Sequence, residues 1–192
     1  MGFDKNGVAF IELPSDSLDQ LQYSFLKEQL LKVPGVEAVS FTLDAPTNFI
    51  SNNTSFYFDN EPIKKDLELN LQFEDTGYTH LFNIPITAGR VPYQTDTTNK
   101  LLVNETLVRK LGFKNDKDIL NKTISFDGII KYPVVGVMHD FNTKSLKEAI
   151  SSFVLATNIH AYNFIALRIN PAGIQTTLGK MQKTFKDIYV QP

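Results

Sequence analysis

The stretch Val134-Val135-Gly136-Val137-Met138-His139-Asp140-Phe141 carries most of what this sequence reveals about its fold. Its apolar and glycine residues predict a buried strand, and the polar pair His139-Asp140 marks the exit from that strand. Two motifs upstream belong with it. Ala88-Gly89-Arg90 predicts a turn, and Leu102-Val103-Asn104-Glu105 predicts a strand that runs into a helix capped by Asn104. The fold expected below is built outward from these three motifs.

The composition is that of an ordinary globular domain and excludes several functions. The chain has 192 residues, of which 42% are hydrophobic and 21% charged, and its net charge is −2. Because acidic and basic residues are interspersed, neither a nucleic-acid partner nor a polybasic membrane patch is expected. The absence of cysteine excludes disulfides, thiol catalysis and cysteine-ligated zinc.

No part of the sequence predicts a membrane span, since such a helix needs about 20 consecutive apolar residues. The first residues, 1–5, also lack the apolar region of a signal peptide. Two interpretations remain open from the residues alone: a cytosolic protein, or one domain of a larger membrane protein.

The first part of the chain predicts a β-α-β unit. Residues 8–13 and 36–43 are apolar runs that predict strands. Between them lies a helix that Ser15 or Ser17 can cap and Pro34-Gly35 ends. Its expected apolar stripe consists of Leu18, Leu21, Phe25, Leu30 and Val33. A crossover of this length suits a parallel pair of strands.

Shorter elements are expected in the middle of the chain. Residues 67–73 alternate between apolar and polar, which predicts a strand with one buried and one wet face. Asp75 can cap a short helix that follows. Asn104 is expected to cap a helix over residues 105–111, with Gly112 in the left-handed position after it.

The remainder predicts a hairpin, two strands and a final helix. The hairpin joins residues 123–126 to 131–138 through Asp127-Gly128. Strands over residues 153–157 and 162–169 precede the helix. The helix has an apolar stripe made of Ile174, Leu178, Met181, Phe185 and Ile188.

Strand and helix material at both ends, with shorter elements inserted between, predicts a mixed α/β (α+β) fold with two lobes. One lobe is expected from residues 1–75 plus 145–192, and the other from the inserted residues 76–144.

His139-Asp140 is the most tempting catalytic pair, because a histidine beside a carboxylate can serve as a general base or a metal half-site. Adjacent residues on a strand point to opposite faces, however, and the sequence contains no G-x-S-x-G nucleophile elbow. A structural role for Asp140, tying down the turn after the strand, is therefore the favoured interpretation.

Other apparent sites fail on detail. The three histidines, His80, His139 and His160, lack the spacing of a metal site. Residues 173–181 resemble a phosphate-binding loop, but five residues separate the glycines and Met181 replaces the required Ser or Thr, so a helix is expected instead. Ala88-Gly89-Arg90 could bind an anion, although a turn glycine followed by an arginine that pairs with a carboxylate is the favoured alternative. We expect no catalytic residue, metal or cofactor.

The order of the motifs resembles the MacB-like periplasmic core domain of FtsX-type ABC transporter permeases, with the opening Gly2-Phe3-Asp4 similar to members of Bacteroidetes type. That family shows "GR", a strand into "NE" opening a helix that ends "LG", then "iGK", "GVv-Df" and a Ser-Leu pair. Leu120-Asn121-Lys122 stands in the "iGK" place, where Asn121 can still adopt the positive φ of glycine. Ser145-Leu146 matches the final pair. The matching residues are Gly89, Arg90, Asn104, Glu105, Gly112, Gly136, Asp140 and Phe141.

The resemblance implies a non-catalytic extracytoplasmic domain of an inner-membrane protein. It implies that the lobe from the chain ends is porter-like and the inserted lobe sabre-like. It also implies a role in coupling cytoplasmic ATP hydrolysis to periplasmic movement, in efflux or in lipoprotein or peptide export. The implied partners are the protein's own transmembrane helices, an ATPase domain or subunit, a periplasmic or outer-membrane protein, and a second copy of the chain.

Two alternatives from other classes remain. The first is a small hydrolase or metalloenzyme using His139 and Asp140, which needs a pocket where both meet a third polar group. The second is a stand-alone periplasmic ligand-binding module, which needs an apolar pocket of several hundred Å³.

Overall fold

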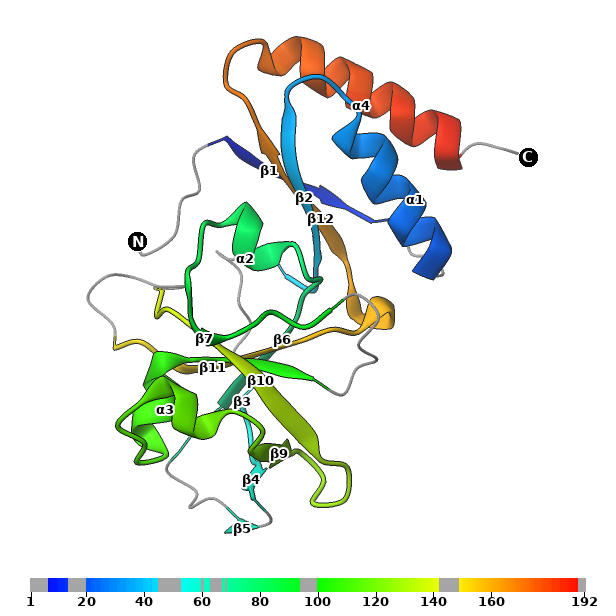
Figure 1. Cartoon of the computed structure of the whole chain (residues 1–192). Helices are drawn as coiled ribbons and strands as arrows, with labels where there is room; N and C mark the ends of the chain where they lie inside the picture. Colours follow the sequence, from blue (N-terminus) through cyan, green and yellow to red (C-terminus); the bar gives the residue numbers. More distant parts are fainter. Residues whose placement is uncertain are drawn as a thin grey trace.

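The computed structural model describes residues 7–13, 20–44, 53–59, 61–62, 67, 69–93, 100–141 and 149–189. Within this part of the chain, the strands form two sheets, one of three strands and one of nine. The two sheets lie at opposite ends of an elongated molecule, and helix α2 (Tyr78–Leu81) lies between them (Figure 1). A mixed α/β fold is therefore confirmed.

The smaller sheet combines the first two strands described with the last one. Its order is β1 (Val8–Glu12), β12 (Phe164–Ile169) and β2 (Val36–Thr42). Since β1 and β2 both pair antiparallel with β12, they run parallel to each other but are not neighbours. The expected parallel pair is thus split by a strand that comes more than 120 residues later in the chain, and no local pattern could signal that insertion.

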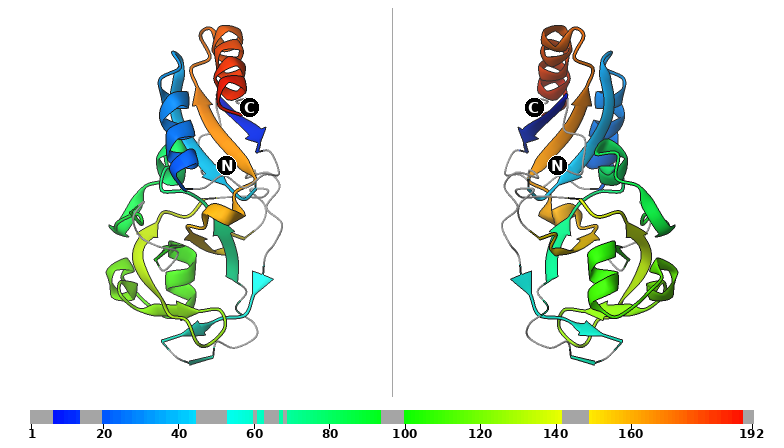
Figure 2. Two further views of the ribbon diagram at one scale, coloured as in Figure 1. Left: turned by 90° about the vertical axis from the view of Figure 1, so that its right-hand side faces the viewer. Right: turned by 90° about the vertical axis from the view of Figure 1, so that its left-hand side faces the viewer.

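Helices α1 (Gln20–Leu31) and α4 (Ile174–Tyr189) cover one face of this sheet (Figure 2). On α1 the buried side chains include Tyr23, Leu26 and Leu30, and Val33 in the turn after the helix is buried as well. Phe25, expected in the stripe, is 51% exposed. Residues three or four apart in the sequence lie on the same face of a helix, and the buried residues follow that spacing. Phe25 is five residues from Leu30 and therefore lies on a different face.

Helix α4 follows its expected stripe. Met181 is buried, and Leu178, Phe185 and Ile188 pack against the same core cluster, while Ile174 in the first turn is exposed. The Thr177 hydroxyl donates a hydrogen bond to the Pro34 carbonyl oxygen over 3.1 Å, which fastens α4 to the turn after α1. Residues 174–181 are therefore helical, as expected, and form no phosphate-binding loop.

The larger sheet contains the remaining strands. Its order is β3 (Asn53–Thr54), β6 (Leu69–Phe73), β11 (Ser152–Ala156), β8 (Leu101–Asn104), β10 (Tyr132–Met138), β9 (Thr123–Ser125), β4 (Tyr57–Phe58) and β5 (Glu61–Pro62), and β7 (Ile86–Gly89) also pairs with β10. Helix α3 (Glu105–Lys110) packs on one face of it. Short 3₁₀ helices occur at Asp116–Ile119 and Ile159–Ala161.

The polar face of β6, which was expected to be exposed to solvent, is buried. Asn70 and Gln72 are buried, at 6% and 0% exposure, and the Gln72 amide donates to Asn70 Oδ1 over 3.0 Å. They pair with Phe153 and Leu155 of β11, which belong to the core cluster on the second face of the sheet. The expectation was wrong because both faces of this sheet are covered at β6.

That second cluster joins the two sheets, and we call it the seam. It combines α2 residues with Ala38 of β2, Ala166 of β12 and Leu102 of β8. Backbone hydrogen bonds cross it from Leu43 N–H to the Phe73 oxygen (2.8 Å) and from Asp75 N–H to the Phe41 oxygen (2.9 Å). β6 and β11 lie in the nine-stranded sheet, whereas the expected lobe limits (1–75 with 145–192, and 76–144) group them with the chain ends.

The hairpin of β9 and β10 is present, with Ile124 opposite Tyr132. Asn121 and Gly112 have φ of +65° and +89°, as their expected turns require. Asp75 Oδ1 accepts from Gly77 N–H rather than capping α2 itself.

Ser15, Ser17, Leu18 and Ser145-Leu146 lie outside the described residues. In the part of the chain described, no helix has the length and apolarity to cross a membrane.

Candidate functional site

The motif residues converge where strand β10 ends beside the first turn of α3. We call this cluster the α3 junction; it consists of Asn104, Glu105, Thr106, Arg109, His139 and Asp140. It joins three strands and a helix that are separated by up to 49 residues in the chain. The motifs that drew attention in the sequence are therefore neighbours in space.

Asn104 caps α3 and also fastens strand β11. Its Oδ1 accepts from Leu107 N–H (3.2 Å), the expected cap, and from Phe153 N–H (2.9 Å). Its Nδ2 donates to Asp140 Oδ1 (2.8 Å) and to the Ser151 carbonyl oxygen (3.0 Å). Every polar atom of this buried amide therefore has a partner, which is what burial of an amide requires.

Among the described residues, each group that contacts the Asp140 carboxylate is a hydrogen-bond donor. Oδ1 receives Thr106 N–H over 2.9 Å in addition to the Asn104 amide, and Oδ2 receives the Thr106 hydroxyl over 2.8 Å. Arg109 forms an ion pair with Oδ2. A carboxylate at the first turn of a helix also meets the positive end of the helix dipole. Asp140 thus holds the start of helix α3, whereas residues 142–148, which follow the strand and which it was expected to tie down, lie outside the described residues.

Glu105 reaches back from α3 to the same strand end. Its Oε2 accepts from Asp140 N–H over 3.0 Å and lies 2.8 Å from His139 Nδ1. His139 and Asp140 therefore have different side-chain partners, and His139 is more than half exposed. The catalytic alternative required both side chains to meet a third polar group in a pocket, and this arrangement does not provide it.

Gly89 and Gly136 are paired across β7 and β10. A Cβ on Gly136 would overlap the Arg90 carbonyl oxygen and lie 2.9 Å from Leu102 Cδ1. Gly89 has a φ of +68°, and a Cβ there would overlap the Val135 carbonyl oxygen. Both positions therefore need glycine for close backbone approach.

Arg90 turns away from the junction. Its Nη1 donates to the Val91 carbonyl oxygen (2.9 Å), and its guanidinium lies 3.8 Å from the centre of the Tyr93 ring. This stacking is a cation–π contact. Phe141, which is buried, packs edge-on against Phe153 with ring centres 5.3 Å apart, and so extends the junction into the seam.

Metal binding finds no support in the described residues, which contain no group of three or more His, Cys, Asp or Glu able to hold an ion. Thr106 and Arg109 are the junction residues that sequence reasoning missed. Both sit on the exposed side of a short amphipathic helix, and their partner Asp140 lies more than 30 residues away, so no local spacing could reveal them.

A pocket beside the seam is lined by residues that include Glu74, Tyr78, Leu102 and Thr157. Its volume is about 20 Å³, which is enough for one or two water molecules. A ligand of drug size needs several hundred Å³, so this pocket does not support the ligand-binding alternative.

Comparison with known proteins places these residues in a family. The profile of the MacB-like periplasmic core domain matches residues 5–188. No curated protein sequence matches the chain.

Solved structures agree with the profile. The periplasmic region of MacB from Actinobacillus actinomycetemcomitans superposes with a TM-score of 0.65 at 12% identity, covering 99% of this chain and 87% of that one. The extracellular domain of the noncanonic ABC-type transporter YknZ from Gram-positive bacteria gives 0.58 at 16% identity, with 95% and 94% covered. A domain assigned to a permease protein from Porphyromonas gingivalis gives 0.56 at 16% identity, with 96% and 85% covered. The chain belongs to the family of MacB-like periplasmic core domains, the extracytoplasmic part of ABC transporter permeases.

Proposed function

We propose that this domain transmits movement: it couples ATP hydrolysis in the cytoplasm to a change of conformation and of partner contact outside the membrane. The observation that carries the proposal is the division of the described chain into two sheets joined through one seam. The first strand described, β1, belongs to the smaller sheet, and the last helix described, α4, covers one face of that sheet (Figure 1). We propose that this sheet is the side of the domain that faces the membrane.

The seam is suited to relative movement of the two sheets. Among the described residues, the backbone bonds of Leu43 and Asp75 cross it, together with the bonds of Lys27 and Ser40 to the Asp75 carboxylate. The side chains of the seam cluster are otherwise mostly apolar, so the directional contacts that separation must break are concentrated at Asp75. The larger sheet is in contrast held rigid by the α3 junction, which ties α3 to β8, β10 and β11. Movement delivered to the smaller sheet would therefore shift the larger sheet as a body. We propose that these two bodies are the porter-like and sabre-like lobes.

A disulfide across the seam tests this proposal. Thr42 and Glu74 form an isolated antiparallel bridge, flanked by the two hydrogen bonds of the seam. Such pairs have Cα atoms about 4.5 Å apart, within the range that a disulfide spans. Because the chain contains no cysteine, Thr42→Cys with Glu74→Cys adds a unique pair. In the complete permease with its ATPase, the oxidised pair is expected to abolish transport while ATP hydrolysis continues, and reduction is expected to restore transport.

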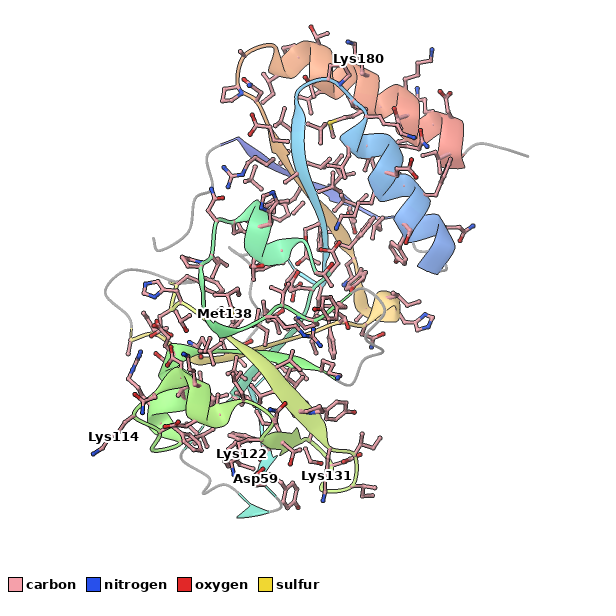
Figure 3. All side chains as sticks on the ribbon, viewed as in Figure 1. Asp59, Lys114, Lys122, Lys131, Met138 and Lys180 are labelled. Atoms are coloured by element: carbon pink, nitrogen blue, oxygen red, sulfur yellow. The ribbon has the colours of Figure 1, made fainter. Side chains whose placement is uncertain are left out.

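Partner contact is supported by an exposed apolar loop at the far end of the larger sheet. Between β9 and β10, Ile129 and Ile130 are 80% and 50% exposed. Asp127 Oδ1 accepts from both of their N–H groups (2.8 Å each), which fixes the loop with the two side chains outward. Lys131 beside them lies at the opposite end of the molecule from Lys180 of α4 (Figure 3). We propose that this tip inserts into an apolar groove of a partner protein in the extracytoplasmic space.

Replacing both tip residues, Ile129→Ser with Ile130→Ser, is expected to lower transport in cells at least tenfold. The stability of the domain and the ATPase rate of the purified permease should be unchanged, because these side chains touch little of the fold. Ile174→Ser, an exposed isoleucine on α4, is the matched control. Equal transport by the tip variant and the control would remove the tip from the proposal.

A further inference from the structure

Glu74 is a buried carboxyl group that the junction and the coupling role leave unexplained. It follows β6 directly, where the smaller sheet meets the larger one. Its bridge to Thr42 and its N–H bond to the Ala156 oxygen (2.9 Å) fix its backbone to both sheets. The residue is 2% exposed, and neither carboxyl oxygen accepts a hydrogen bond from the described residues.

The described groups around Glu74 do not compensate a negative charge on its carboxyl group. Asp75 follows it in the chain, and its own carboxylate is already held by Lys27 Nζ (2.6 Å), Ser40 Oγ (2.6 Å) and Gly77 N–H (2.9 Å). Lys27 is therefore committed to Asp75. Among the described residues, the other titratable groups that face Glu74 are Asp44, Tyr78 and Tyr162, which are acids and phenols.

Burial raises the pKa of Glu74 well above its ordinary value of 4.5, and the charges of Asp75 and Asp44 raise it further. The nearby Thr42 hydroxyl, which donates to the Asp44 carbonyl oxygen, opposes this rise only in part. Burial, and then the charge of Glu74, also raises the pKa of Tyr78. Burial raises the pKa of Tyr162 as well, followed by the charges of Asp75 and Glu74.

The small pocket gives this carboxyl a route to solvent. Glu74 lines it together with Tyr78 of α2 and Leu155 of β11, and the pocket has room for about one or two waters. Separation of the sheets would widen this space and hydrate the group.

We propose that Glu74 makes the seam a proton-sensitive joint: its carboxyl is neutral while the two sheets are closed on it, and it ionises when they separate. Each opening then releases one proton to the extracytoplasmic side. A closed seam is favoured in acid and an open seam in alkali, so the pH outside the membrane sets the balance between the two arrangements. This inference does not depend on the coupling role, because it concerns the isolated domain.

Proton linkage gives the direction in which pH changes the stability of the closed state. Between the ordinary value of 4.5 and the raised pKa of Glu74, the closed state binds one more proton than a state in which the group is hydrated. The closed state is therefore fully stabilised below pH 4.5 and loses about tenfold in its equilibrium constant for each pH unit above it. The loss stops once the pH passes the raised pKa.

Hydrogen exchange of the seam amides tests the joint in the isolated domain. The amides of Leu43 and Asp75, whose hydrogen bonds cross the seam, are followed between pH 5 and pH 8, with the protection factors corrected for the intrinsic pH dependence of exchange. In the natural sequence, protection is expected to fall by up to tenfold per pH unit. In Glu74→Gln, which keeps the shape but cannot ionise, protection should not change with pH. Glu37→Gln, an exposed glutamate on β2, should behave as the natural sequence does.

Equal pH slopes in Glu74→Gln and in the natural sequence would overturn the proposal. If the variant does not fold, a carbon-13 titration of the natural sequence measures the pKa of the Glu74 carboxyl directly. Titration near 4.5, the ordinary value, would overturn the proposal, and titration at clearly higher pH would support it.

Discussion

Gly136→Ala is expected to destabilise the domain by about 3 kcal/mol, since overpacking a close contact costs about 1–3 kcal/mol and more where the neighbours cannot move. The added Cβ would overlap the Arg90 carbonyl oxygen. That oxygen cannot retreat easily, because Arg90 N–H is bonded to the Val135 oxygen on the strand that carries Gly136. Denaturant unfolding of the domain measures the change, and a fall in melting temperature of roughly 8 °C should accompany it.

Gly179→Ala is the matched control for this prediction. Gly179 lies within α4, and an added Cβ there meets no atom within 4 Å. The substitution should stabilise the protein by about 0.5–1 kcal/mol, because alanine favours the helix interior. If both alanine variants had the same stability as the natural sequence, the close approach of β7 to β10 would not be what requires glycine at position 136.

Asp140→Asn is expected to cost about 3 kcal/mol, although the substitution keeps the shape of the side chain. Within the described residues, the contacts to its carboxylate all come from donors, on Asn104, Thr106 and Arg109. An amide replaces one acceptor oxygen with a further donor, so buried N–H or O–H groups at the start of α3 lose their acceptor, at about 1–3 kcal/mol each. Unfolding in urea measures the loss.

Two control variants separate this effect from simple loss of charge. Asp118→Asn, at an exposed carboxylate bonded to Asn115, should change stability by less than about 0.5 kcal/mol. Arg109→Ala should cost less than about 1 kcal/mol, because the arginine is 58% exposed and its ion pair is screened by water. A larger loss for Arg109→Ala than for Asp140→Asn would show that the ion pair, and not the hydrogen-bond network, holds the junction.

Local patterns predicted the local features of the fold. The capping role of Asn104 and the left-handed conformation of Gly112 are confirmed, because both depend on residues within one helical turn. The stripe of α4 is confirmed at Leu178, Met181, Phe185 and Ile188 for the same reason, but not at Ile174, which is exposed. The alternation of β6 did predict a strand, but it could not say what covers the second face of that strand.

The largest errors concern contacts between distant segments. Phe25 is exposed because a different face of α1 packs against the sheet. Strand β12 lies between β1 and β2, although it follows them in the chain by more than 120 residues. Glu74 continues the polar positions Asn70 and Gln72 of β6 by one step, and it is buried as they are. Its burial follows from the seam, and the seam is formed by elements that no single stretch of sequence brings together.

The central claim is that the two sheets must move against each other at the seam for the permease to work. It is tested most directly by transport through the complete permease that carries cysteines in place of Thr42 and Glu74, compared before and after reduction. We expect no transport in the oxidised protein, continued ATP hydrolysis, and recovery of transport with a reductant. Each single-cysteine variant should transport equally in both conditions. Full transport by the oxidised pair, with the disulfide verified by mass spectrometry, would contradict the claim.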